Sequence, residues 1–143
     1  MFKNLGLVFG LLLSICMANA ADGSSKPAAQ ARQEMEAQSA EIYTHSMNVS
    51  NAASHYADEQ VAAGKKEYAK AARSCADCAD MAAMTAKLTA RGSPMAGHAR
   101  EALAKCCDAT VAECEKLSDP AMTACMDACK KAGADCRMQM SIQ

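Results

Sequence analysis

Residues 119–138 read DPAMTACMDACKKAGADCRM, and this stretch decides the fold. Sulfur-bearing and small side chains recur in it at spacings of three and four residues, at Met122, Cys125, Cys129, Ala132 and Cys136. At about 100° per residue, these positions fall within an arc of roughly 80° on a helix. Asp119 is a favoured N-cap residue, and Pro120 suits the first helical position. The stretch therefore predicts a helix that ends near Met138 and has one sulfur-rich face.

The preceding segments show the same periodicity more weakly. Ser93 and Pro94 are typical of a helix start, and that helix is expected to end near Leu117. Its inward face carries Leu103, Cys107, Thr110 and Cys114, with Cys106 about 100° to one side. A helix over about residues 66–90 carries Cys75 and Cys78 and is closed by Arg91-Gly92. The first helix, over about residues 39–63, stops at Gly64 and has no cysteine.

Four helices of similar length with very short connections must alternate in direction. No stretch alternates β-branched and polar residues as a strand would. We therefore expect an all-α fold, an antiparallel up-down-up-down four-helix bundle over residues 39–143. Because the first helix is the least apolar, the alternative is a three-helix hairpin array with a loosely attached first helix.

The N-terminus has the pattern of a cleavable signal peptide. Lys3 precedes an apolar run over residues 5–15 that is short for a membrane span, and Ala18-Asn19-Ala20 resembles a signal peptidase site. We expect residues 1–20 to be removed and residues 21–38 to form a flexible N-terminal tether. The predicted location is the periplasm or outside the cell, with no membrane association after cleavage.

Composition indicates a core that needs a cross-link. Apolar residues make up 51% of the chain, yet aromatic residues make up 3% and there is no Trp. A core of Ala, Met and Cys buries little apolar area per residue, and small domains of this kind usually need disulfides or a metal. The formal charge of −1 gives no electrostatic reason to expect nucleic-acid or membrane partners.

The cysteines have three interpretations. The first treats free cysteines as small buried hydrophobic residues, which suits one or two positions rather than the eight that remain, of nine, once Cys16 is removed with residues 1–20. The second is a disulfide-stapled helical interaction protein without metal, because exported compartments oxidise thiols. Residues three or four apart on a helix have Cβ atoms about 5–6 Å apart, which is too far for a disulfide. Bridges would have to join different helices at matched levels.

The predicted hairpin of the last two helices matches only one pair of cysteines. It places Cys114 beside Cys125. It places Cys107 beside Ala132, Thr110 beside Cys129, and Leu103 beside Cys136. A metal ion fills the gap that a disulfide cannot span, and lines of soft thiolates suit a monovalent soft ion such as Cu(I) better than zinc. Metal binding is therefore the third and favoured interpretation.

The last two helices also carry a family resemblance. Residues 124–129 (ACMDAC) and 135–138 (DCRM), preceded by Cys107 and residues 112–116 (AECEK), resemble the cysteine-rich four-helix-bundle copper storage proteins. The resemblance implies that interior cysteines hold many Cu(I) ions, mostly between two thiolates, and that exported members store copper or keep it from doing harm. Met122, Thr110 and Ala132 stand where family members often have Cys, and the first helix lacks the family's cysteines. We therefore expect fewer copper ions, which makes a chaperone role as plausible as bulk storage.

The sequence thus predicts a non-enzymatic protein that binds several Cu(I) ions for storage, sequestration or detoxification. Its partners would be copper ions and a copper donor or acceptor protein, with the oligomeric state left open. The predicted metal ligands are Cys75, Cys78, Cys106, Cys107, Cys114, Met122, Cys125, Cys129 and Cys136.

Overall fold

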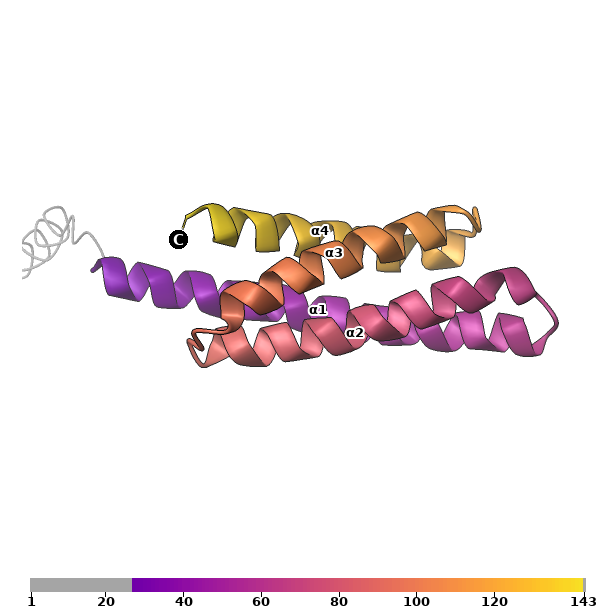
Figure 1. Ribbon diagram of the computed structural model, residues 1–143, viewed down its shortest axis with the longest axis horizontal. Coiled ribbons are helices and arrows are strands. Elements are labelled where there is room, and N and C mark those ends of the chain that lie inside the picture. Colours follow the sequence, from indigo (N-terminus) through magenta and orange to yellow (C-terminus); the bar gives the residue numbers. More distant parts are fainter. Residues whose placement is uncertain (1–26, 143) are drawn as a thin grey trace, which may run out of the picture. The chain divides into compact units, whose positions relative to one another are not determined.

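A computed structural model describes residues 27–142. From Arg32 onward, the described residues form one compact unit, the helical bundle. The elements are α1 (Ala28–Ala62), the 3₁₀ turn η1 (Lys66–Tyr68), α2 (Ala69–Ala90), α3 (Ala96–Glu115), the 3₁₀ turn η2 (Pro120–Met122) and α4 (Thr123–Ser141). Successive helices run in alternating directions, so the predicted all-α four-helix bundle is confirmed (Figure 1).

Local sequence signals fix the breaks between the helices. Gly64 and Gly92 follow α1 and α2 with φ angles of 92° and 61°, a left-handed conformation that glycine adopts without steric cost. The Asp119 carboxylate accepts a hydrogen bond of 2.9 Å from the Ala121 backbone N–H, as an N-cap does. These breaks place each helix beside its neighbours with connections of only a few residues.

The first helix is longer than the sequence indicated. Helix α1 begins at Ala28, whereas the sequence predicted a flexible tether up to residue 38 and a helix from about residue 39. Residues 28–38 (AAQARQEMEAQ) are almost all strong helix formers, so the helix propagates past its packed part. The first buried residue of α1 is Ser39, which is where the bundle was predicted to begin. The predicted signal peptide and residues 21–26 lie outside the described residues.

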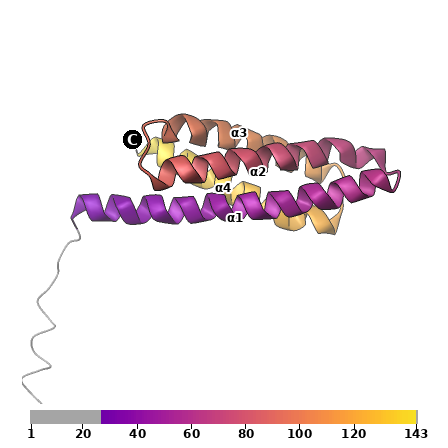
Figure 2. The ribbon, with the colours of Figure 1, turned by 90° about the horizontal axis from the view of Figure 1, so that it is seen from below.

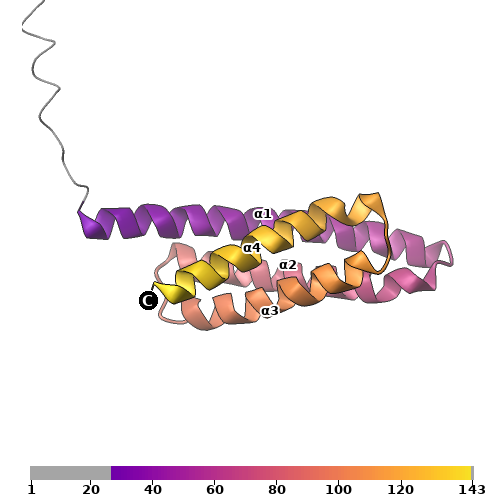
Figure 3. The same ribbon diagram turned by 90° about the horizontal axis from the view of Figure 1, so that it is seen from above.

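Helix α1 packs on the bundle through polar side chains. Its buried face consists of Ser39, Tyr43, Ser46, Ser50, Ala53, Ser54 and Ala57. The Ser54 hydroxyl donates to the Ala72 carbonyl of α2, and the Tyr43 hydroxyl donates to the Asp135 carboxylate of α4. Figures 2 and 3 show α1 running alongside α2 and α4 in turn. The bundle therefore has four helices, and the α1 backbone lies farther from its neighbours than the α3 backbone lies from α2 and α4.

Small side chains fill the interior, as the composition suggested. Most buried apolar residues are Ala or Cys, and the largest fully buried side chains are Tyr43, Leu103 and Met122. The interior of the bundle is thus lined chiefly by methyl groups and sulfur.

The described helices include no segment with the length and hydropathy of a membrane span.

Candidate metal centre

Six buried cysteines form two clusters inside the bundle. The first triad is Cys75, Cys114 and Cys125, and the second triad is Cys78, Cys107 and Cys129. Each triad takes one cysteine from α2, one from α3 and one from α4, and its sulfur atoms all lie within 4.8 Å of one another. Convergence of three helices on each cluster is what a shared metal ion requires.

In each triad, the α2 sulfur lies within 4 Å of the sulfurs from α3 and α4. In the first triad, Cys75 Sγ lies 3.8 Å from Cys114 Sγ and 3.7 Å from Cys125 Sγ. In the second triad, Cys78 Sγ lies 3.7 Å from Cys107 Sγ and 3.5 Å from Cys129 Sγ. A disulfide bond is about 2.05 Å long, and all eight cysteines in the described residues are free.

Helical spacing explains why the six cysteines form two clusters. Cys75 and Cys78 are one turn apart on α2, and Cys125 and Cys129 are one turn apart on α4. Cys107 and Cys114 are two turns apart on α3, which runs antiparallel to α2 and α4. The later α3 cysteine, Cys114, therefore meets the earlier cysteines of α2 and α4, Cys75 and Cys125. Between them, the Thr110 hydroxyl donates a 3.0 Å hydrogen bond to the Ser74 carbonyl of α2. Thr110 therefore joins α3 to α2 between the two triads.

The structure corrects one part of the predicted register. Cys114 lies beside Cys125 as predicted, but Cys107 joins Cys129, and the predicted contact partner of Cys129 was Thr110. Cys107 packs against α4 at Gly133: a Cβ at Gly133 would lie 3.5 Å from Cys107 Cβ, an ordinary van der Waals distance. Helix α3 therefore approaches α4 closely at this level.

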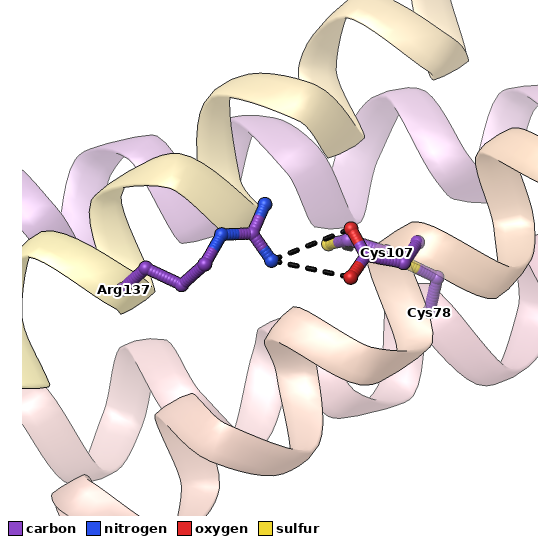
Figure 4. A network of polar contacts seen from close by, with 4 residues as sticks. Cys78, Cys107 and Arg137 are labelled. Atoms are coloured by element: carbon purple, nitrogen blue, oxygen red, sulfur yellow. Dashed lines mark hydrogen bonds and ion pairs between the residues drawn. The ribbon is translucent and has the colours of Figure 1, made fainter.

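An ion pair covers this close approach from outside. Arg137 donates to both carboxylate oxygens of Asp108, at 3.2 and 3.4 Å, beside the Cys78 and Cys107 side chains (Figure 4). The pair is solvent-exposed, so it contributes little stability by itself. Cys107 behind it is only 1% exposed.

Helix α1 contributes a hydroxyl that the sequence analysis missed. Ser50 Oγ lies 3.8 Å from Cys125 Sγ and 3.8 Å from Cys129 Sγ, so it contacts both triads. The signal was present in the sequence: Ser39, Tyr43, Ser46 and Ser50 are spaced by four, three and four residues. This is the spacing of the cysteine face of α4, with oxygen in place of sulfur.

The other predicted ligands lie outside the triads. Cys136 is fully buried, Cys106 is half-buried at the edge of the α3 face, and Met122 is fully buried in η2. Asp135 precedes Cys136 in the chain, and its buried carboxylate accepts a 2.6 Å hydrogen bond from the Tyr43 hydroxyl of α1. Tyr43 and Asp135 are also residues that the sequence analysis did not single out.

Burial and mutual hydrogen bonding make the thiols unequal as acids. Burial raises the pKa of the Cys136 thiol to about 11, and a hydrogen bond with Cys125 together with burial raises the pKa of Cys114 to about 12. Hydrogen bonds from Cys114, Cys129 and Cys75 lower the pKa of Cys125. Hydrogen bonds from Cys106, Cys107 and Cys129 likewise lower the pKa of Cys78. Each triad thus contains one cysteine that loses its proton more readily than its neighbours.

The sulfur spacing fits a thiolate-bound ion with small adjustment. With a metal–sulfur bond of about 2.3 Å, a planar three-coordinate ion separates its sulfur ligands by about 4.0 Å. A linear two-coordinate ion separates them by about 4.6 Å at the same bond length. The measured distances of 3.5–3.8 Å require the sulfurs to move by a few tenths of an ångström in the first case and about 1 Å in the second.

Comparison with known proteins identifies a family of copper-binding proteins. The chain matches the model of the copper storage protein family over residues 35–141, which includes all six triad cysteines. No individual curated protein matches the chain, and no solved structure matches it. Because the match covers well over half of the sequence, the chain belongs to the copper storage protein family.

Proposed function

We propose that this protein binds Cu(I) in the two cysteine triads and thereby sequesters copper. The observation that carries the proposal is the convergence of six buried, free thiols from three helices on two clusters. Family membership supports copper as the cargo. Nothing in the proposal requires catalysis, since a storage or carrier site needs ligands and no reacting substrate.

The ligand set favours the monovalent state of copper. Thiolate and thioether ligands select soft ions such as Cu(I), whereas Cu(II) prefers nitrogen and oxygen ligands in a tetragonal arrangement. The three histidines, His45, His55 and His98, are all exposed, whereas the triad cysteines are buried. The triads therefore present Cu(I) with sulfur ligands, with the Ser50 hydroxyl as the neighbouring oxygen.

The proposed capacity is small. Beyond the triads, Cys136, Cys106 and Met122 complete the predicted ligand set, and α1 adds hydroxyls where further thiolates would extend the line. A few ions per chain suit detoxification or transfer to an acceptor protein as well as they suit storage. The signal-peptide pattern of residues 1–20 supports the periplasm as the place where this occurs.

A Cu(I) titration of the reduced protein against a chromophoric Cu(I) chelator tests the proposal. We expect tight uptake of at least two ions per chain, with uptake reduced in Cys75→Ser and Cys78→Ser, each of which removes one triad ligand. His55→Ala serves as the control, because His55 is exposed and should leave the copper number unchanged. Uptake of fewer than two ions, or equal uptake by the triad variants, would contradict the proposal.

Thiol counting on protein taken directly from its compartment separates copper binding from a disulfide-stapled structure. After denaturation in the presence of a copper chelator, the copper-binding proposal expects most of the eight cysteines to react as free thiols. A count near zero would mean that the cysteines pair covalently in the cell, and the interaction-protein alternative would replace the copper proposal.

A further inference from the structure

Neither triad has an unpaired positive charge beside it: Arg137, which lies outside the second triad, is solvent-exposed and paired with the Asp108 carboxylate. Among the described residues, Arg100 is the one buried cation, and its guanidinium donates to Thr89 at the other end of α2 from Cys75. A charge buried without a partner carries a large desolvation cost. The charge of a bound ion must therefore balance the charge of the thiolates that hold it.

Charge balance discriminates between candidate ions. Three thiolates around Cu(I) leave two net negative charges, and three thiolates around a divalent ion leave one. Three thiolates around a trivalent centre that prefers sulfur leave no net charge. This neutral complex therefore has the smallest desolvation cost in a low-dielectric core. Arsenic and antimony in the trivalent state form centres of this kind.

The sulfur spacing is compatible with a trivalent centre. Trivalent arsenic carries a lone pair, so its three sulfur ligands form a pyramid with angles near 100° rather than a plane. At a bond length of about 2.3 Å, that angle separates the sulfurs by about 3.5 Å. The four sulfur–sulfur distances of 3.8, 3.7, 3.7 and 3.5 Å lie between this value and the roughly 4.0 Å of a planar ion, so a pyramidal centre fits with shifts of at most a few tenths of an ångström.

We propose that each triad binds one trivalent metalloid, with arsenite as the representative ligand, in addition to and independently of the copper function. Neutral arsenous acid, As(OH)₃, reacts with three thiols to give As(S-Cys)₃ and three molecules of water. Three As–O and three S–H bonds break, and three As–S and three O–H bonds form. The oxidation state does not change, and no further reactant is needed.

Both the ligand and the product suit a sealed site. Arsenous acid is uncharged at neutral pH, so it enters the bundle without the desolvation cost of an ion. The cysteines that meet it are fully buried or nearly so, with Cys107 and Cys125 each 1% exposed. The three converging thiols of each triad are already arranged around a common centre, which reduces the entropy cost of forming three bonds.

Native mass spectrometry with thiol counting tests the proposal on the reduced, copper-free protein. With stoichiometric sodium arsenite we expect two arsenic atoms per chain, each replacing three hydrogens. After denaturation, which exposes every cysteine including the buried Cys136, six of the eight thiols should still resist alkylation, leaving Cys106 and Cys136 as the labelled sites in peptide mapping, whereas arsenic-free protein should be labelled at all eight. This pattern needs no variant and so does not depend on whether a mutant folds.

Two matched serine variants sharpen the test. Cys114→Ser removes one ligand from the first triad, so we expect one tightly bound arsenic instead of two. Cys136→Ser changes an equally buried cysteine outside the triads and should retain both. Four arsenic atoms per chain, random labelling of all eight cysteines, or no binding would overturn the proposal. Because copper binding is titrated separately, such a result would leave the copper proposal standing.

Discussion

At the residue scale, the buried pair of Tyr43 and Asp135 shows what a polar group in this core requires. The Asp135 carboxylate is 8% exposed, and the Tyr43 hydroxyl is fully buried with the carboxylate as its partner at 2.6 Å. Burial and this hydrogen bond raise the pKa of Tyr43, so the hydroxyl remains a donor. Loss of either group would leave the other buried without a partner.

Tyr43→Phe should therefore destabilise the apo-protein by about 2 kcal/mol, the usual cost of removing a hydrogen bond to a charged buried group. Urea denaturation of the reduced protein measures the change. Tyr56→Phe is the matched control, because Asp119 would keep its 2.8 Å hydrogen bond from Tyr68 and its bond from the Ala121 N–H. Equal destabilisation by the two variants would show that the Tyr43 hydrogen bond has no special weight.

Ser50 offers a second test at a single residue. Its hydroxyl lies 3.8 Å from a sulfur of each triad, so a thiol at this position would contact both. We expect Ser50→Cys to bind at least one more Cu(I) ion per chain than the unmodified protein. Ser50→Ala removes the hydroxyl without adding sulfur and should leave the copper number unchanged. An unchanged number in Ser50→Cys would mean that α1 does not face the metal-binding region.

At the scale of single elements, two glycines have opposite roles. Gly64 follows α1 with a φ of 92°, a backbone conformation that is strained for any residue with a side chain. No atom would lie within 4 Å of an added Cβ, so the strain is in the backbone alone. Gly133 lies inside α4, where glycine costs roughly 0.5–1 kcal/mol relative to alanine. A Cβ there would meet Arg137 Nη2 at 3.1 Å and Cys107 Cβ at 3.5 Å. The first contact is with the end of a flexible exposed side chain that can move.

Gly133→Ala should therefore stabilise the protein by about 0.5 kcal/mol, since the helix gain exceeds the loss of an exposed ion pair. Gly64→Ala should destabilise it by about 1 kcal/mol through backbone strain alone. Thermal unfolding of both variants measures the difference. If Gly133→Ala is instead destabilised, the close approach of α4 to Cys107 leaves no room for a methyl group.

The helices also show how much of the fold and of the site could be predicted from the sequence. Four helices, their order and the N-cap at Asp119 followed from periodicity and capping residues, because these signals are local. The start of α1 was misplaced because Ala28 to Ser39 has helix propensity without an apolar face to reveal it. The Cys107–Cys129 contact and the Ser50 contacts depend on how closely helices approach, which Gly133 and the α1 hydroxyls control. Such interhelical distances leave little trace in spacing alone.

At the scale of the whole molecule, the eight thiols couple folding to pH. Burial and hydrogen bonding raise the pKa of six of them in the folded state above the unfolded value of 9.0: Cys75, Cys106, Cys107, Cys114, Cys129 and Cys136. The pKa values of Cys78 and Cys125 are lowered. A raised pKa contributes stability below the unfolded pKa that is lost as pH rises through the folded pKa. A lowered pKa contributes stability that is present above the unfolded pKa and lost as pH falls.

The reduced apo-protein should accordingly be most stable near pH 9: the stabilising contribution of the two lowered thiols is complete there, and the six raised thiols cause a steep loss of stability at higher pH. Urea midpoints at about pH 7, 9 and 10.5 measure the curve. Cys136→Ser should show a shallower alkaline loss, because it removes one group whose folded pKa is about 11. Copper-loaded protein should lose much less stability above pH 9, since its ligand thiols are already deprotonated. An alkaline loss equally steep with and without copper would mean that the thiols that titrate are not the thiols that bind the metal.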